Sequence, residues 1–247
     1  MDLGLTGKTF VVTGGSRGLG RATAAVLIAE GANVVLAARD EAGVRTAADE
    51  LGAVGVAADL ADPEAPDRLV RAAQDAYGRL DGALLSVGGP PPGASLELDD
   101  DQWRSAFDSV FLGAVRMCRA VVAALPAEGG SLALVLSTSV KAPIAGLAAS
   151  NGLRPGLAML AKTIADELGP RGVRVNGLLP GRVDTDRVRQ LDGPDPADRA
   201  RSERAIPLRR YGTPEEFGRV AAFVLSPAAA YVSGAMVPVD GGATRAL

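Results

Sequence analysis

The stretch Thr13-Gly14-Gly15-Ser16-Arg17-Gly18-Leu19-Gly20 decides the fold of this chain. It follows a β-branched and aromatic run at 9–12, which is typical of a buried strand. It leads into an Ala-rich segment at 21–30, which favours a helix that stops at Gly31. A strand, a glycine turn and a helix in this order are the context of a dinucleotide-binding turn. Glycines also serve tight turns that bind nothing, but a second strand expected at 33–37 favours nucleotide binding.

Each glycine of the turn has a separate physical task. Gly14 permits the sharp bend, Gly18 leaves room for a pyrophosphate group, and Gly20 lets the helix lie close to the sheet. The free N–H groups at the helix start would face the phosphates. The predicted cofactor contacts in this turn are Gly14, Ser16, Arg17, Gly18, Leu19 and Gly20.

The length, composition and net charge of the chain restrict the class of protein. A length of 247 residues allows one large α/β domain or two small ones, and 47% hydrophobic residues support a sizeable core. A net charge of −3 gives no electrostatic reason to expect a nucleic-acid partner. No apolar run approaches the roughly twenty residues of a membrane span, and the N-terminus lacks the layout of a signal peptide. The single cysteine, Cys118, fits a reducing compartment, so we expect a cytoplasmic protein with no membrane partner.

The chain contains no histidine. Ser-His-Asp and Cys-His catalysis are therefore excluded, as is any metal held by histidine, and we predict no metal site. Proton transfer would have to come from Tyr, Lys, Asp, Glu or water. Cys118 lies among apolar residues at helical spacing, which favours a buried thiol over a nucleophile.

Strand-like and helix-like segments alternate to the end of the chain. This alternation predicts a single α/β domain over 1–247, built on one doubly wound Rossmann-type parallel sheet with helices on both faces. Ligands should then bind beyond the carboxyl ends of the strands. The polar segment at about 182–206 is expected to be a mobile substrate lid. Strands are expected at 9–12, 33–37, 53–57, 82–85, 132–136, 173–179 and 237–239. Helices are expected at 21–30, 40–51, 62–77, 99–125 and 213–225, and a further helix is expected to end near 169.

Four groups of residues, in this order and spacing, resemble the short-chain dehydrogenase/reductase family over the whole length of the chain. Within the family, the 3-oxoacyl carrier-protein reductase-like branch is the most similar. The resemblance implies hydride transfer between a nicotinamide cofactor and the carbonyl of a small molecule. It also implies a homotetramer, or a homodimer, with the two long helices and the last strand in the subunit contacts. The groups are the glycine turn; Asp59-Leu60; Asn176 followed by Pro180-Gly181-Arg182-Val183-Asp184-Thr185; and Tyr231-Val232-Ser233-Gly234 followed by Val239-Asp240-Gly241-Gly242.

The residue at the carboxyl end of the second strand helps to decide whether NAD or NADP binds. A carboxylate there would hold the ribose 2′-hydroxyl of NAD, but this position is Ala38. Arg39 follows it, and Arg17 lies in the glycine turn, so two guanidinium groups could hold a 2′-phosphate. The sequence thus favours NADP(H) over NAD(H). In the alternative, Arg39 is a solvated loop residue and Asp40 binds the ribose.

The resemblance also implies contacts along the rest of the cofactor. Asp59 and Leu60 would lie at the adenine, although Asp59 could simply end a strand. Val183 and Thr185 would lie at the nicotinamide, although Thr185 could only cap the lid. The predicted cofactor contacts outside the turn are Arg39, Asp59, Leu60, Ser86, Gly88, Pro180, Gly181, Val183 and Thr185.

The catalytic positions of the family do not match. The resemblance implies a serine, a tyrosine and a lysine four residues after it, and these fall at Thr138, Asn151 and Pro155. Thr138 and Asn151 could hydrogen-bond a carbonyl, but an amide cannot supply a proton near neutral pH. Lys141 and Arg154 lie nearby and could bring positive charge to the site, or could be solvated charges on a loop.

Pro155 also affects where the helix around it can begin. Inside a helix it would remove one backbone bond and clash with the carbonyl of Asn151. We therefore predict a helix that begins late, with Pro155 in its first turn and Asn151 in the loop before it.

Two functions follow from these residues. The first is an NADP(H)-dependent oxidoreductase that acts on a carbonyl or an activated alkene by an altered proton route. The second is a non-catalytic NADP(H)-binding protein for sensing or assembly.

Replacing Arg39 tests the choice of cofactor. Arg39→Asp should weaken NADPH binding by about tenfold or more and favour NADH, because a carboxylate would repel the 2′-phosphate and accept from a ribose hydroxyl. Fluorescence titration with both cofactors measures this, and an unchanged preference would count against the two-arginine site.

Overall fold

The computed structural model describes residues 2–86, 88–193 and 195–245. Within them the strands form one parallel sheet in the order β3-β2-β1-β4-β5-β6-β7. This confirms the predicted doubly wound Rossmann-type sheet, because the chain first builds outward from β1 to β3 and then crosses back to β4. The strands are β1 Thr9–Thr13, β2 Asn33–Ala38, β3 Val54–Ala57, β4 Gly82–Leu85, β5 Gly130–Val135, β6 Val173–Pro180 and β7 Met236–Val239.

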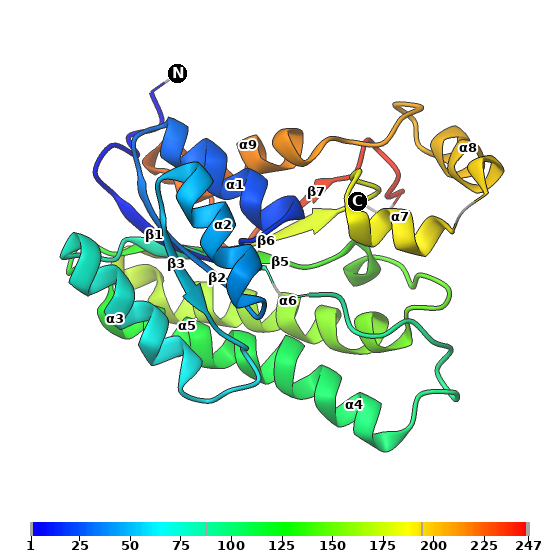
Figure 1. Cartoon of the computed structure of the whole chain (residues 1–247), viewed down its shortest axis with the longest axis horizontal. Helices are drawn as coiled ribbons and strands as arrows, with labels where there is room; N and C mark the ends of the chain where they lie inside the picture. The colour runs from blue at the N-terminus through cyan, green and yellow to red at the C-terminus, as the bar shows by residue number, and fades with distance from the viewer. Residues whose placement is uncertain (1, 87, 194, 246–247) are drawn as a thin grey trace.

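Helices cover both faces of the sheet (Figure 1). On one face lie α1 Gly18–Ala29, α2 Glu41–Leu51 and α9 Pro214–Leu225, over a core that contains Phe10, Leu36 and Phe217. On the other lie α3 Ala65–Tyr77, α4 Asp100–Ala106, α5 Gly113–Ala124 and α6 Ala148–Leu168, over a core that contains Met117 and Leu132. Nearly all the strand residues of β1, β2 and β5 are buried, as expected for a parallel sheet covered on both sides.

The long helix expected at 99–125 has a wide turn in its middle. Asp99 caps α4 through a capping box with Gln102, and a π-helical segment, Phe107–Leu112, joins α4 to α5. The rings of Phe107 and Phe111 stack across this turn with their centroids 5.2 Å apart. Such π turns are rare and often lie near functional sites.

The predicted late start of the helix after residue 147 is wrong. Helix α6 begins at Ala148 and contains Pro155 in its interior. Residues outside the helix hold its first turn. The Ala148 N–H donates to the Gly93 carbonyl at 3.2 Å. The side-chain amide of Asn151 accepts from the Ile144 N–H and donates to the Ile144 carbonyl. These bonds oppose the roughly 3 kcal/mol that an interior proline costs.

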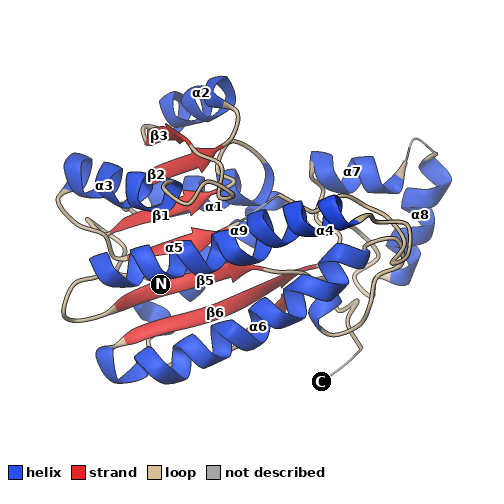
Figure 2. Cartoon of the chain, turned by 90° about the horizontal axis from the view of Figure 1, so that it is seen from below, coloured by secondary structure: helices blue, strands red, loops and turns tan. Residues whose placement is uncertain are grey.

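The segment expected to be a lid contains two short helices, α7 Asp186–Asp192 and α8 Pro196–Ala205. Both lie beyond the carboxyl ends of the strands (Figure 2). Side chains of Thr185 and Asp195 accept from backbone N–H groups and start the two helices. The mobility of this segment stays a prediction. None of the described helices combines the length and apolar character that crossing a bilayer requires.

Buried Asp81 ties the amino ends of β1 and β4 together. Its carboxylate accepts from the Thr9 N–H at 2.8 Å and from Arg79 Nε and Nη2 at 2.8 and 2.6 Å. Burial alone would raise the pKa of Asp81, but the bonds from Arg79 and Thr9 hold this pKa below its ordinary value.

Asp81→Asn should lower the free energy of unfolding by about 2 kcal/mol at pH 7, because charge-assisted bonds to a buried carboxylate are lost. The native pKa is depressed, so the stability difference should be constant above about pH 5 and shrink below about pH 4. Urea unfolding at several pH values measures it, with the exposed Asp75→Asn as control. A difference that grew on acidification would contradict this role.

Candidate functional site

The glycine turn after β1 is closed on one side by backbone atoms. Gly14 has a φ of +61°, and a Cβ there would clash with the carbonyl oxygen of Ser86. A Cβ at Gly20 would clash with the carbonyl of Gly14, so α1 can approach the turn only because residue 20 has no side chain.

Gly18 is open by contrast. Its φ is +57°, and the side chain of Thr185, 3.5 Å from where a Cβ would lie, is the described group that approaches it. Arg17, at the N-cap of α1, makes no side-chain capping bond, and the first turn of α1 has no acidic residue. Free N–H groups beside an open glycine fit a phosphate group.

Thr13 and Ser86 join the carboxyl ends of β1 and β4. The Thr13 hydroxyl donates to the Ser86 carbonyl at 3.0 Å and accepts from the Ser86 N–H at 2.8 Å. The strand order reverses between these two strands, which is where doubly wound sheets bind ligands.

Arg17 and Arg39 are exposed, and neither has an ion-pair partner within the described ranges. An Arg39 Nη lies 3.9 Å from where a Cβ of Gly88 would be, so its guanidinium reaches toward the loop after β4. Asp40 is turned back over Gly43 in the first turn of α2. Asp59 accepts from the Ala61 N–H at 3.0 Å and is exposed, whereas Leu60 is buried.

The segment after β6 lies opposite the glycine turn, with Thr185 near Gly18. Pro180 ends β6, and a Cβ at Gly181 would clash with Asp240. Buried Val183 forms a bridge with Gly212, which leads to Thr185 at the N-cap of α7, opposite Gly18. Gly18 and Thr185 therefore face each other at the carboxyl edge of the sheet, where a doubly wound fold binds its ligands.

At the carboxyl end of β5, helix α6 presents Ser150 and Arg154. The hydroxyl oxygens of Ser150 and Ser139 lie 3.3 Å apart, and both residues are buried. Arg154 is 6% exposed, and its Nη1 donates to the carbonyl of Val135 at 2.6 Å. Residues four apart share a helix face, so Ser150 and Arg154 form one polar face against β5.

Arg154 is a buried cation. Burial, and then the field of Arg187, lowers the pKa of Arg154 to about 10. The guanidinium therefore stays protonated at neutral pH and can stabilise a negative charge beside it. Arg187 lies on α7 and donates to the Pro90 carbonyl at 2.9 Å.

Comparison with known proteins agrees with this geometry. A sequence profile described as enoyl-(acyl carrier protein) reductase matches residues 13–244. The chain belongs to the short-chain dehydrogenase/reductase family. It is 37% identical over 255 residues to 3beta-hydroxysteroid dehydrogenase 1 of Eggerthella lenta, covering 97% of this chain and 95% of the relative. It is 30% identical over 243 residues to the 3-oxoacyl-[acyl-carrier-protein] reductase of Vibrio cholerae, covering 97% and 98%. The crystal structure of L-sorbose reductase from Gluconobacter frateurii with NADPH and L-sorbose superposes with a TM-score of 0.91 at 29% identity, covering all of both chains.

In this dehydrogenase/reductase, the catalytic residues predicted from the sequence are spread over two faces. Thr138 begins a short 3₁₀ turn, Thr138–Val140, and is half-buried, and Lys141 follows it on the exposed surface. Asn151 accepts from the Ile144 N–H at 3.0 Å and donates to the Ile144 carbonyl at 2.8 Å. The amide of Asn151 is therefore turned to the loop before α6, while Arg154 lies on the face toward β5.

Ser139 and Ser150 were missing from the predicted site. The frame predicted at Asn151 and Pro155 stays a prediction, and the structure adds Ser150 and Arg154 as candidates for the same two roles. One signal could have found them: Ser150 and Arg154 have the four-residue spacing of hydroxyl and cation, which Asn151 and Pro155 cannot supply.

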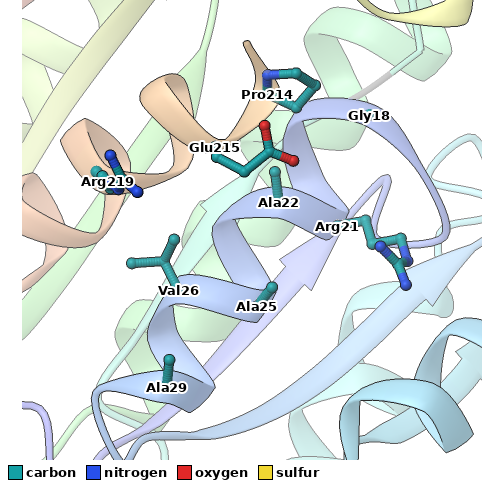
Figure 3. Close-up of a pocket in the computed structure, with 9 residues that line it drawn as sticks. All are labelled: Gly18, Arg21, Ala22, Ala25, Val26, Ala29, Pro214, Glu215 and Arg219. Carbon is teal, nitrogen blue, oxygen red and sulfur yellow. The ribbon is translucent and has the colours of Figure 1, made fainter.

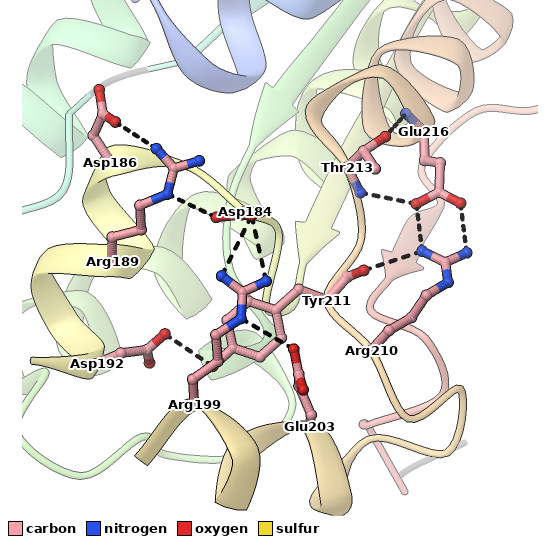
Figure 4. A network of polar contacts seen from close by, with 10 residues as sticks. All are labelled: Asp184, Asp186, Arg189, Asp192, Arg199, Glu203, Arg210, Tyr211, Thr213 and Glu216. Atoms are coloured by element: carbon pink, nitrogen blue, oxygen red, sulfur yellow. Dashed lines mark hydrogen bonds and ion pairs between the residues drawn. The ribbon is translucent and has the colours of Figure 1, made fainter. Parts of the chain in front are cut away.

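A polar network holds the segment at 182–206, which the sequence predicts to be a lid (Figure 4). Arg182 pairs with Asp192, which also accepts from the Tyr211 hydroxyl at 2.8 Å. The guanidinium of Arg199 lies 4.6 Å from the Tyr211 ring centroid and pairs with Asp184 at 3.3 Å. The network joins α7, α8 and the segment before α9.

A shallow groove lies beside the glycine turn, between α1 and α9 (Figure 3). Small side chains of α1, including Ala25 and Ala29, line it, with Glu215 and Arg219 on the α9 side. The groove includes Gly18 of the glycine turn. It includes no residue of α6, α7 or α8, so it is separate from the face of α6 that carries Ser150.

Removing the Tyr211 hydroxyl should loosen the lid. Tyr211→Phe deletes one buried bond worth about 1 kcal/mol, so amide exchange in α7 and α8 should rise about fivefold. Hydrogen–deuterium exchange by mass spectrometry measures this. Tyr77→Phe, on α3, is the matched control and should leave the lid unchanged. Equal exchange in wild type and Tyr211→Phe would show that the network does not hold the lid.

Proposed function

We propose that this protein is an NADP(H)-dependent oxidoreductase that transfers hydride to the carbonyl of a small molecule. The observation that carries the proposal is that two groups follow the carboxyl ends of β1 and β5 in the same parallel sheet: the glycine turn, where Gly18 faces Thr185, and the buried residues Ser139, Ser150 and Arg154. Arg17 and Arg39, which have no ion pair in the described part of the chain, support NADP(H) over NAD(H). The solved L-sorbose reductase binds NADPH, and a relative in Azotobacter vinelandii is an L-rhamnose 1-dehydrogenase that uses NAD(P)+, 33% identical to this chain.

The residues around β5 would manage the proton and the charge. Bound NADPH would supply the hydride. Ser150 and Ser139 would hold the carbonyl oxygen by hydrogen bonds, and Thr138 at the start of the neighbouring turn would assist. Arg154 would stabilise the alkoxide that forms, and water or Lys141 would deliver the proton. Asn151 would position the loop at Ile144.

The remaining predicted contacts keep their proposed places. Ser86 and Gly88 would line the nicotinamide ribose, and Asp59 and Leu60 would line the adenine. Pro180, Gly181, Val183 and Thr185 would close over the nicotinamide.

The long helices would form the subunit contacts of a homotetramer or homodimer. An apolar hollow on α4 and α6 is lined by Trp103, Phe107 and Leu153, and Phe107 is 43% exposed. Met159, on the same helix α6, is 70% exposed. A second copy of the chain would cover these side chains.

A non-catalytic NADP(H)-binding protein is the second candidate. It is favoured by the positions of the tyrosines, since within the described residues no phenol approaches Ser139 or Arg154. Tyr77 and Tyr211 donate to Val34 and Asp192, and Tyr231 is exposed.

One experiment separates the two candidates. NADPH is titrated by its fluorescence, and its oxidation is then followed with ketones, 3-oxoacyl thioesters and enones. Oxidation with any of these substrates would support the oxidoreductase. Tight binding with no turnover over the whole panel would support the binding protein.

Rebuilding a phenol–ammonium pair tests which face of α6 is the reacting one. Ser150→Tyr with Arg154→Lys should raise ketone reduction by about a hundredfold, because a general acid contributes at least that much. The matched control is Asn151→Tyr with Pro155→Lys, which should gain nothing. Circular dichroism checks that both variants fold. A gain in the control alone would reverse the assignment.

A further inference from the structure

The start of helix α6 is supported by a loop that is distant in sequence. Leu147, at the N-cap of α6, makes no side-chain capping bond. The first N–H groups of a helix have no partner inside it, and here the Ala148 N–H donates to the Gly93 carbonyl at 3.2 Å. The Gly93 N–H donates in turn to the Gly146 carbonyl at 2.8 Å, so the two segments pair around Leu147 as a short parallel bridge. Gly93 therefore does the work of an N-terminal cap for α6.

Pro155 makes this outside support more important. Proline has no N–H to donate to the carbonyl of Asn151, so one fewer bond joins the first turn of α6 to the rest of the helix. Ser150 lies in this weakened turn, with its hydroxyl 3.3 Å from that of Ser139. A shift at Gly93 would therefore loosen the turn that places Ser150 against Ser139.

Gly93 ends a stiff loop after β4, residues 88–93, which we call the proline loop. Pro90, Pro91 and Pro92 follow one another in it. Three consecutive prolines have restricted φ angles and offer no N–H groups, so the loop stays extended and bends little. Pro90 is buried, whereas Pro91 and Pro92 are exposed. A contact that holds Pro90 is therefore passed along the loop to Gly93.

Arg187 of helix α7 makes that contact. Its side chain is half-buried, and its Nη2 donates to the Pro90 carbonyl at 2.9 Å. Its Nε and Nη2 lie 3.0 and 3.1 Å from where a Cβ of Gly89 would be, so the guanidinium occupies the space that a side chain at residue 89 would fill. One arginine thus joins α7 to the proline loop by a hydrogen bond and by close packing.

We infer that Arg187 is a positioning residue that acts on the reacting face through the proline loop. It holds the loop at Pro90, and the loop holds the first turn of α6 at Ala148, so that Ser150 faces Ser139. The role of Ser150 in this inference rests on the proposed function. The position of α7, a helix of the segment predicted to be a lid, is thereby coupled to the placement of Ser150.

The test is hydrogen–deuterium exchange of the whole protein, read in the peptides that cover residues 147–152. Arg187→Gln should raise exchange there about fivefold, because the proline loop loses its tie to α7. Gly89→Ala should do the same, because its Cβ takes the space of the guanidinium. Arg187→Lys keeps a donor for the Pro90 carbonyl and should recover part of the protection. The matched control is Arg189→Gln on the same helix, whose ion pairs lie within 184–189, and it should leave residues 147–152 at the wild-type level.

Two exchange results would overturn the inference. One is unchanged exchange of residues 147–152 in both Arg187→Gln and Gly89→Ala. The other is an equal rise in Arg189→Gln, because a general loosening of α7 would then be the cause. Circular dichroism checks that every variant folds.

Kinetics give a second readout with any ketone that the wild type reduces. Arg187→Gln should lower kcat about tenfold and leave the KM for NADPH within about twofold, because a misplaced Ser150 affects the chemical step. A rise in this KM with kcat unchanged would contradict a positioning role. Wild type that reduces nothing refutes the proposed function alone, and the exchange experiment still decides whether Arg187 holds the first turn of α6.

Discussion

The bond from the buried Arg154 guanidinium to the Val135 carbonyl joins helix α6 to the carboxyl end of β5. A charge that is 6% exposed must find an acceptor, and the carboxyl end of β5 supplies one. With Arg154 turned to the sheet, Ser150 one turn earlier faces Ser139, and Asn151 is turned by about 100° toward Ile144. These bonds together turn Ser150 and Arg154 to one side of α6 and Asn151 to another.

The glycine turn depends on a different constraint, the close approach of backbone to backbone. Gly14 lies against the Ser86 carbonyl and Gly20 against Gly14, while Thr13 joins the ends of β1 and β4. These contacts make the turn rigid and leave Gly18 open toward Thr185. The glycine turn and the start of α6 follow the carboxyl ends of β1 and β5, and α7 and α8 lie beyond the same edge of the sheet (Figure 2).

Sequence reasoning predicted the sheet well, because periodic apolar runs and glycine turns are local signals. The strands expected at 33–37 and 82–85 and the helix expected at 213–225 agree with β2, β4 and α9 to within one residue at each end, and a capping box of Thr213 with Glu216 begins α9. The sequence predicts a mobile polar segment at about 182–206 and no helices there, because α7 and α8 are short and polar and are stabilised by ion pairs such as Arg199–Asp184. Such long-range pairs leave no periodic pattern in the sequence.

The start of α6 was predicted wrongly for a related reason. The cost of Pro155 is local and visible in the sequence, whereas the bonds that offset it come from Gly93 and Ile144. The spacing of Ser150 and Arg154 is visible in the sequence, but the contact of Ser150 with Ser139 is shown only by the fold. The cofactor contacts and the roles of Thr138 and Lys141 remain predictions.

A crystal structure of the NADPH complex tests the account most directly. We predict the pyrophosphate over Gly18, the 2′-phosphate between Arg17 and Arg39, and the reactive nicotinamide carbon facing Ser150, with Arg154 within hydrogen-bond distance of the nicotinamide ribose or a bound anion. A nicotinamide ring placed against Asn151, or a cofactor bound away from Gly18, would contradict it.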